Sequence, residues 1–129
     1  MKSYLAIKFH EDVKNKNLVE EISESLEKAG FETVVMIRDY EKWGTVKFSP
    51  EELMALTFKL ICESECLIME FSEKGVGLGI EAGYAYAKNI PIIVIAKIGS
   101  DISNTLRGIA KKVIFYDTPK DLVASLKEI

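Results

Sequence analysis

The chain has 129 residues, of which 48% are hydrophobic and 29% are charged, a balance typical of one globular domain rather than a disordered segment. Its 17 basic and 20 acidic residues give a net charge of −3, which argues against binding to a nucleic-acid polymer. The longest apolar runs, such as 91–96, are far shorter than the ~20 residues of a membrane helix.

The N-terminus has no signal-peptide pattern, so we expect a cytoplasmic protein that does not bind membranes. Cys62 and Cys66 are therefore expected to be reduced, buried thiols rather than a disulfide. His10 is the single histidine, and without a Cys/His cluster we expect no metal and no cofactor.

Strand and helix patterns alternate along the chain. Apolar, β-prone segments predict strands at 3–9, 33–37, 66–69, 90–96 and 113–116. Helical periodicity and end signals predict helices at 17–30, 49–63, from the glycines at 75–79 to about 89, 101–109 and 119–129. Ser49, Pro50 and Glu52 form a typical helix start, with an N-cap, an N1 proline and a capping-box glutamate. Residues 38–48 predict a loop of functional length.

This order predicts an α/β fold in which residues 1–129 form a single domain. We expect a flavodoxin-like (Rossmann-like) five-stranded parallel sheet of order 2-1-3-4-5, with helices on both faces. The ligand crevice of such a sheet lies beyond the carboxyl ends of its strands, at the switch point between strands one and three. The segments after Phe9 and after Glu70 are therefore the expected site.

A glycine-rich stretch, Gly75, Gly77 and Gly79, follows the third strand. The segment 77–82 fits the dinucleotide pattern G-x-G-x-x-A, but that pattern belongs after the first strand and needs an acidic residue closing the next one. A nucleotide cofactor is therefore not expected. The glycines either let the backbone approach an anion or a sugar at a helix start, or serve close helix–sheet packing.

Three side chains have two interpretations each. Glu81, expected in the first helical turn, is either stabilised by the helix dipole or points into the crevice as a nucleophile or base. His10 is either a solvated loop residue or, with Lys8, a contact to an anionic group. Trp43 either stacks on a ligand base or packs its loop against the core.

The residues of two segments resemble those of a known family. The segment 4–9 (YLAIKF) is similar to the opening Y-L-A-G-P-F of nucleoside 2-deoxyribosyltransferases. The segment 75–85 (GVGLGIEAGYA) resembles their G-x-G-x-x-E-L-G-Y-A motif, which the related 2'-deoxynucleoside 5'-monophosphate N-glycosidases share. The segment 103–108 resembles the family segment that follows strand four.

The resemblance implies cleavage or transfer at the N-glycosidic bond of a 2'-deoxynucleoside or its 5'-monophosphate, through a glycosyl-enzyme intermediate on Glu81. Tyr4 would orient that nucleophile. The region of Ser103 and Asn104 would reach a neighbouring subunit's site, which implies a homodimer or higher homo-oligomer. The predicted substrate-binding residues are Lys8, His10, Trp43, Ser72, Gly75, Gly77, Gly79, Ser103 and Asn104.

Three positions depart from the family pattern. Ile7 stands where the family has glycine, and Gly75 replaces a Ser or Asp that contacts phosphate or sugar. Thr57 stands near the family's Asp, which leaves protonation of the leaving base to another group, with Glu70 or Glu65 as candidates. These departures favour the alternative function, a non-catalytic nucleotide-binding or sensing module on the same scaffold.

Overall fold

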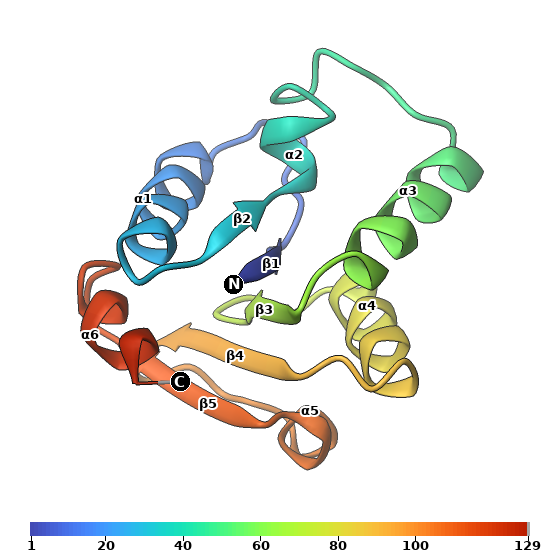
Figure 1. Cartoon of the computed structure of the whole chain (residues 1–129). Helices are drawn as coiled ribbons and strands as arrows, with labels where there is room; N and C mark the ends of the chain where they lie inside the picture. The colour runs from blue at the N-terminus through green and yellow to red at the C-terminus, as the bar shows by residue number, and fades with distance from the viewer. Residues whose placement is uncertain (129) are drawn as a thin grey trace.

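Five parallel strands form one sheet of order β2-β1-β3-β4-β5 in the computed structural model, which describes residues 1–128 (Figure 1). The predicted fold class and strand order are confirmed. The strands are β1 (Lys2–Ala6), β2 (Glu32–Val34), β3 (Cys66–Glu70), β4 (Ile92–Lys97) and β5 (Lys112–Tyr116). The helices are α1 (Lys16–Lys28), α2 (Met36–Asp39), α3 (Pro50–Cys62), α4 (Val76–Ala87), α5 (Asn104–Ile109) and α6 (Asp121–Lys127).

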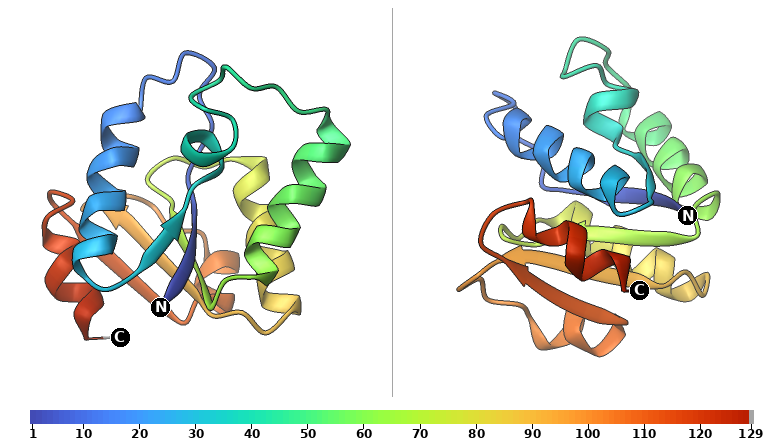
Figure 2. Two further views of the ribbon diagram at one scale, coloured as in Figure 1. Left: turned by 45° about the horizontal axis from the view of Figure 1, so that its top comes forward. Right: turned by 60° about the vertical axis from the view of Figure 1, so that its left-hand side comes forward.

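Two apolar cores lie on opposite faces of the sheet, beneath helices whose arrangement is shown in Figures 1 and 2. Helices α1 and α6 cover one face, and α3, α4 and α5 cover the other. Because side chains alternate along a strand, Tyr4 of β1 packs on the α3–α4 side while its neighbour Leu5 packs on the α1 side. This alternation places Tyr4 on the same side of the sheet as Glu81.

The main difference from the predicted elements lies after β2. Residues 36–39, expected as strand and loop, form the short helix α2. The Asp39 carboxylate accepts a hydrogen bond from the Val35 N–H at 2.8 Å, and Arg38 donates both to Asp39 and to the Thr33 carbonyl. These local bonds turn the chain into a helix immediately after a three-residue strand, which periodicity alone does not reveal.

The start of α3 is as predicted. Ser49 Oγ accepts from the Glu52 N–H, and the Glu52 carboxylate accepts from the Ser49 N–H, so the capping box is complete. The two cysteines are free, and Cys66 is buried as predicted, but Cys62 is exposed. Cys62 lies at the C-terminal end of α3, where its thiol contacts the Tyr84 hydroxyl at 3.0 Å rather than the core. No helix within residues 1–128 is long and apolar enough to cross a membrane.

Candidate active site

A cavity of about 370 Å³ opens where β1 and β2 end and α4 begins. This is the predicted crevice beyond the carboxyl ends of the strands. Its walls combine the segment after β1, the start of α2, one face of α3 and the first turns of α4. The polar and charged side chains among its lining residues are Tyr4, Lys8, His10, Asn15, Glu41, Thr57 and Glu81.

Glu81 lines this cavity from α4 and is half-buried. It is the sixth residue of the helix rather than part of its first turn, so the interaction with the helix dipole is weakened. Burial raises the pKa of the Glu81 carboxyl to about 7. A carboxylate of this kind is ionised at neutral to alkaline pH yet poorly solvated, which suits a nucleophile or a base.

Tyr4 lines the cavity from β1 and is only 2% exposed. Burial, and next the negative charge of Glu81, raise the pKa of the Tyr4 phenol above its ordinary value. The phenol therefore stays neutral and can donate a hydrogen bond within the cavity. Thr57, which also lines the cavity, has a hydroxyl that donates to the Leu53 carbonyl at 2.8 Å.

Donors and cations gather at the α4 end of the cavity. Gly75 is the N-cap of α4, and no side chain caps the free N–H groups of the first turn. The stem of Lys8 passes close by, because a Cβ added to Gly75 would lie 3.8 Å from Lys8 Cγ. Such a helix start beside a lysine favours an anionic group.

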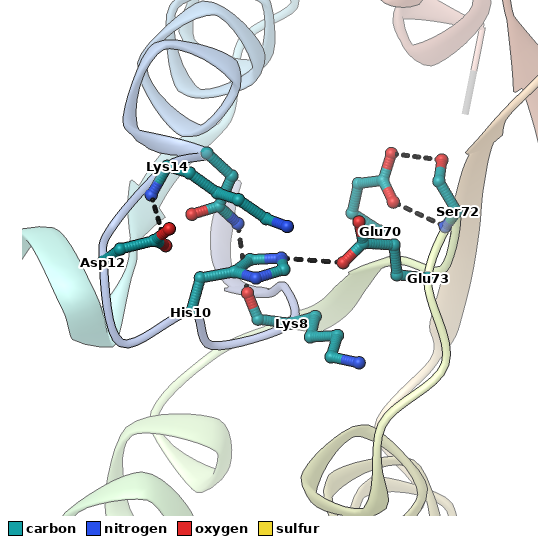
Figure 3. Close-up of polar contacts among 8 residues, drawn as sticks. Lys8, His10, Asp12, Lys14, Glu70, Ser72 and Glu73 are labelled. Atoms are coloured by element: carbon teal, nitrogen blue, oxygen red, sulfur yellow. Dashed lines mark hydrogen bonds and ion pairs between the residues drawn. The ribbon is translucent and has the colours of Figure 1, made fainter.

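His10 adjoins this end of the cavity. His10 Nε2 lies 2.7 Å from Oε2 of Glu73, so the loop after β1 is joined to the loop after β3 (Figure 3). Gly77, another of the predicted binding residues, also lines the cavity.

Five of the predicted binding residues lie outside this cavity: Trp43, Ser72, Gly79, Ser103 and Asn104. The Trp43 ring is partly buried against the α1-side core, and Lys16 Nζ lies 4.9 Å from the ring centroid. Of its two interpretations, the structure therefore favours packing of the loop against the core. Ser72 hydroxyl donates to Glu70 and accepts from the Lys97 N–H. Ser103 caps α5, accepting from the Leu106 N–H at 3.4 Å.

Neither of the two glutamates expected to replace the family's Asp reaches the cavity. Glu70 is 3% exposed, and its carboxylate accepts hydrogen bonds from Ser72 and from the Tyr116 hydroxyl (Figure 3 shows the Ser72 bonds). Glu65 lies at the opposite end of β3, near the Lys2 N–H at 3.5 Å. The carboxylate that does line the cavity besides Glu81 is Glu41, in the loop after α2, which sequence reasoning missed. Only the unusual length of that loop hinted at it.

Comparisons with known proteins found similarity in sequence over half of the chain and in fold over the whole of it. No protein-family profile matches the chain. A curated protein of Syntrophotalea carbinolica, named "Putative 2'-deoxynucleoside 5'-phosphate N-hydrolase 1", is 35% identical over 71 residues. That match covers 53% of this chain and 50% of the relative, so only about half of the relative's length is spanned.

Solved structures share the whole fold. The CMP N-glycosidase BcmB of Clostridium botulinum superposes with a TM-score of 0.71 at 21% identity, covering 100% of both chains. A 2-deoxyribosyltransferase of Bacillus psychrosaccharolyticus has a TM-score of 0.73 at 18% identity, covering 98% of this chain and 96% of that one. The resemblance to the nucleoside 2-deoxyribosyltransferase and N-glycosidase family is confirmed.

Proposed function

We propose that this protein cleaves the N-glycosidic bond of a 2'-deoxynucleoside 5'-monophosphate, with Glu81 as the nucleophile. The observation that carries the proposal is the half-buried Glu81 carboxylate facing the same cavity as the neutral Tyr4 phenol. The name of the curated relative supports the same class of substrate.

The distribution of groups around the cavity suits a nucleotide. The uncapped start of α4 and the Lys8 ammonium provide a place for the 5'-phosphate. Met36, Leu53 and Met54 provide an apolar wall for the flat faces of a base. Glu81 would then face the sugar between these two ends.

In the first step a Glu81 oxygen bonds to the anomeric carbon as the bond to the base nitrogen breaks. The nearby carboxylate also stabilises the positive charge that the sugar develops in the transition state. Tyr4 orients the carboxylate by donating its hydroxyl proton in a hydrogen bond. Water then attacks the anomeric carbon, which releases the sugar phosphate and frees Glu81.

The test compares the wild type with Glu81→Gln on a mixture of deoxynucleoside monophosphates, assayed for free base. We expect release by the wild type and a loss of several orders of magnitude in the variant, as for loss of a covalent nucleophile. Glu21→Gln, an exposed position on α1, is the matched control and should keep full activity. Mass spectrometry with a slow substrate should show a sugar adduct on Glu81.

A non-catalytic nucleotide-binding module is the second candidate. It is favoured by the departures from the family pattern at Ile7, Gly75 and Thr57, where the family has Gly, Ser or Asp, and Asp. Binding of monophosphates by a wild type that releases no base from any of them would establish this alternative. Base release only when a second free base is present would instead indicate a transferase.

A further inference from the structure

A second carboxylate, that of Glu41, lines the cavity from the loop after α2. Glu41 is half-buried, and the residues nearest to it in the sequence that also line the cavity are the apolar Met36 and Ile37. Within residues 1–128, no hydrogen bond or ion pair holds the Glu41 side chain, whereas the carboxylates of the half-buried Asp39 and the buried Glu70 both accept hydrogen bonds. Its carboxyl group is therefore free to contact whatever occupies the cavity.

The backbone holds Glu41 in place through an unusual turn. Lys42 and Trp43 have φ angles of 48° and 58°, in the left-handed region that non-glycine residues seldom adopt, and Gly44 follows at 91°. The Trp43 N–H donates to the Ile37 carbonyl at 2.7 Å, and the Val46 N–H donates to the Glu41 carbonyl at 2.9 Å. Strained backbone of this kind persists only where its surroundings fix it.

The chemistry of the proposed reaction needs a group that the described site otherwise lacks. A base leaves poorly as an anion, so an acid must protonate it as the glycosidic bond breaks. Tyr4 is too weak an acid, because its pKa is raised, and Thr57 has no acidic proton at neutral pH. Glu81 must be ionised to attack. Glu70 and Glu65 lie elsewhere.

We propose that Glu41 is the general acid that protonates the leaving base, a role that rests on the function proposed above. In the first step the Glu41 carboxyl proton passes to the base as the electron pair of the glycosidic bond moves onto it. In the second step the Glu41 carboxylate takes a proton from water as the water oxygen bonds to the anomeric carbon and the ester to Glu81 breaks. The net reaction consumes one water and regenerates both carboxyl groups.

The electrostatics of the cavity support this division of roles. Burial raises the pKa of Glu41 above its ordinary value, against the opposing influence of Lys47. The charges of Glu81 and Glu41 both raise the pKa of Tyr4, so the two carboxylates act on the same small volume. A nucleobase bound against the apolar wall would exclude water from it, and this would further disfavour a negative charge on Glu41.

The test uses two substrates that differ in their need for a proton. One is the deoxynucleoside monophosphate that the wild type cleaves fastest, and the other is p-nitrophenyl 2-deoxyribofuranoside 5-phosphate, whose phenolate leaves unprotonated. Glu41→Gln should lose ~10²–10⁴-fold on the nucleotide, the usual range for general acid catalysis. On the p-nitrophenyl substrate kcat/KM, which reports the first step alone, should stay within about tenfold of the wild type, which also shows that the cavity of the variant is intact. Its kcat should fall, because hydrolysis of the glycosyl-enzyme then lacks the Glu41 base. Glu81→Gln should lose activity on both, and Glu21→Gln on neither.

Three outcomes would overturn the assignment. Nucleotide cleavage by Glu41→Gln at the wild-type rate would exclude Glu41 as the acid. Equal losses on both substrates would make it a structural residue. If the wild type cleaves neither substrate, the proposed function fails together with this role. If the wild type is active, Glu81→Gln is inactive and Glu41→Gln is fully active, only the role of Glu41 is rejected.

Discussion

His10 Nε2 and Glu73 Oε2 lie 2.7 Å apart and join two loops that are 63 residues apart in the sequence (Figure 3). The His10 side chain is 13% exposed, whereas that of Glu73 is 52% exposed, so the contact is only partly shielded from water. The loop after β1 carries Lys8 as well as His10, and the loop after β3 leads into α4. The contact therefore fixes the two sides of the α4 end of the cavity relative to each other.

Removing this contact should loosen the loop without unfolding the protein. Glu73→Ala should change the free energy of unfolding by no more than ~1 kcal/mol, because the contact is partly exposed to water. Amide hydrogen exchange in residues 7–15 should nevertheless become faster, because His10 loses its partner. Glu24→Ala, which breaks the surface pair with Lys28, is the control and should leave these amides unchanged. Unchanged exchange in Glu73→Ala would show that other contacts hold the loop.

The raised pKa of Glu81 links stability to pH. Its carboxyl binds a proton more tightly in the folded chain (pKa about 7) than at its ordinary value of 4.5, so the free energy of unfolding falls as pH rises between these values. Above about pH 7 the free energy of unfolding has lost the whole of this contribution. Glu81→Gln should therefore be more stable than the wild type at pH 8, by roughly 1–3 kcal/mol, and equally stable at pH 4. Urea unfolding at both pH values measures this, and Glu21→Gln should show no such difference.

The ionisation of Glu81 should also determine how the rate of cleavage depends on pH. If Glu81 attacks as a carboxylate, kcat/KM on the p-nitrophenyl substrate, whose leaving group needs no acid, should rise with pH and level off above about 7. On the nucleotide, kcat/KM should fall again at the pH at which Glu41 loses its proton. A rate that is constant from pH 5 to 8 would contradict both the raised pKa and the nucleophilic role.

Lys8 should confer a preference for the phosphorylated ligand. One charge-assisted contact contributes ~1.5–3 kcal/mol, so a deoxynucleoside monophosphate should bind about ten- to a hundredfold more tightly than its nucleoside. Lys8→Ala should remove most of this preference and leave nucleoside binding unchanged, and salt should weaken it. Calorimetry with both ligands tests this, with the exposed Lys28→Ala as control. Equal affinities in the wild type would mean that the phosphate is not recognised.

Glu70 and Tyr116 should stabilise the sheet rather than take part in catalysis. Both are almost fully buried, and the Tyr116 hydroxyl donates to the Glu70 carboxylate. Tyr116→Phe removes a donor from a buried carboxylate and should lower the free energy of unfolding by ~1–3 kcal/mol. Tyr86→Phe, at an exposed position, should stay within ~0.5 kcal/mol of the wild type. A large loss of turnover with unchanged stability in Tyr116→Phe would point to a catalytic role instead.

Self-association remains a prediction from the family resemblance. Exposed apolar side chains are present on α4, at Val76 and Ile80, and after β4, at Ile98. We expect light scattering to give at least the mass of a dimer. A monomer mass would exclude Ser103 and Asn104, which lie outside the cavity of their own chain, from any shared site.

The sequence alone determined the sheet, its strand order and the position of the crevice. Continuous apolar runs, regular helix periods and the capping box of Ser49 and Glu52 are local signals, and the strand–helix alternation restricts the topology to few choices. The Glu81 motif identified the first carboxylate of the cavity in the same way. The elements and the Glu81 motif depend on spacings within short segments, and the strand order depends on the alternation of these elements along the chain.

Tertiary structure decided the rest of the site. Helix α2 depends on side-chain bonds of Arg38 and Asp39, and the left-handed turn at Lys42 and Trp43 depends on contacts with α1 and α2. These two features direct Glu41 toward the cavity and Trp43 away from it. No periodicity encodes that choice, because it depends on hydrogen bonds of side chain and backbone within residues 33–46 and on the contact of Lys16 in α1 with the Trp43 ring.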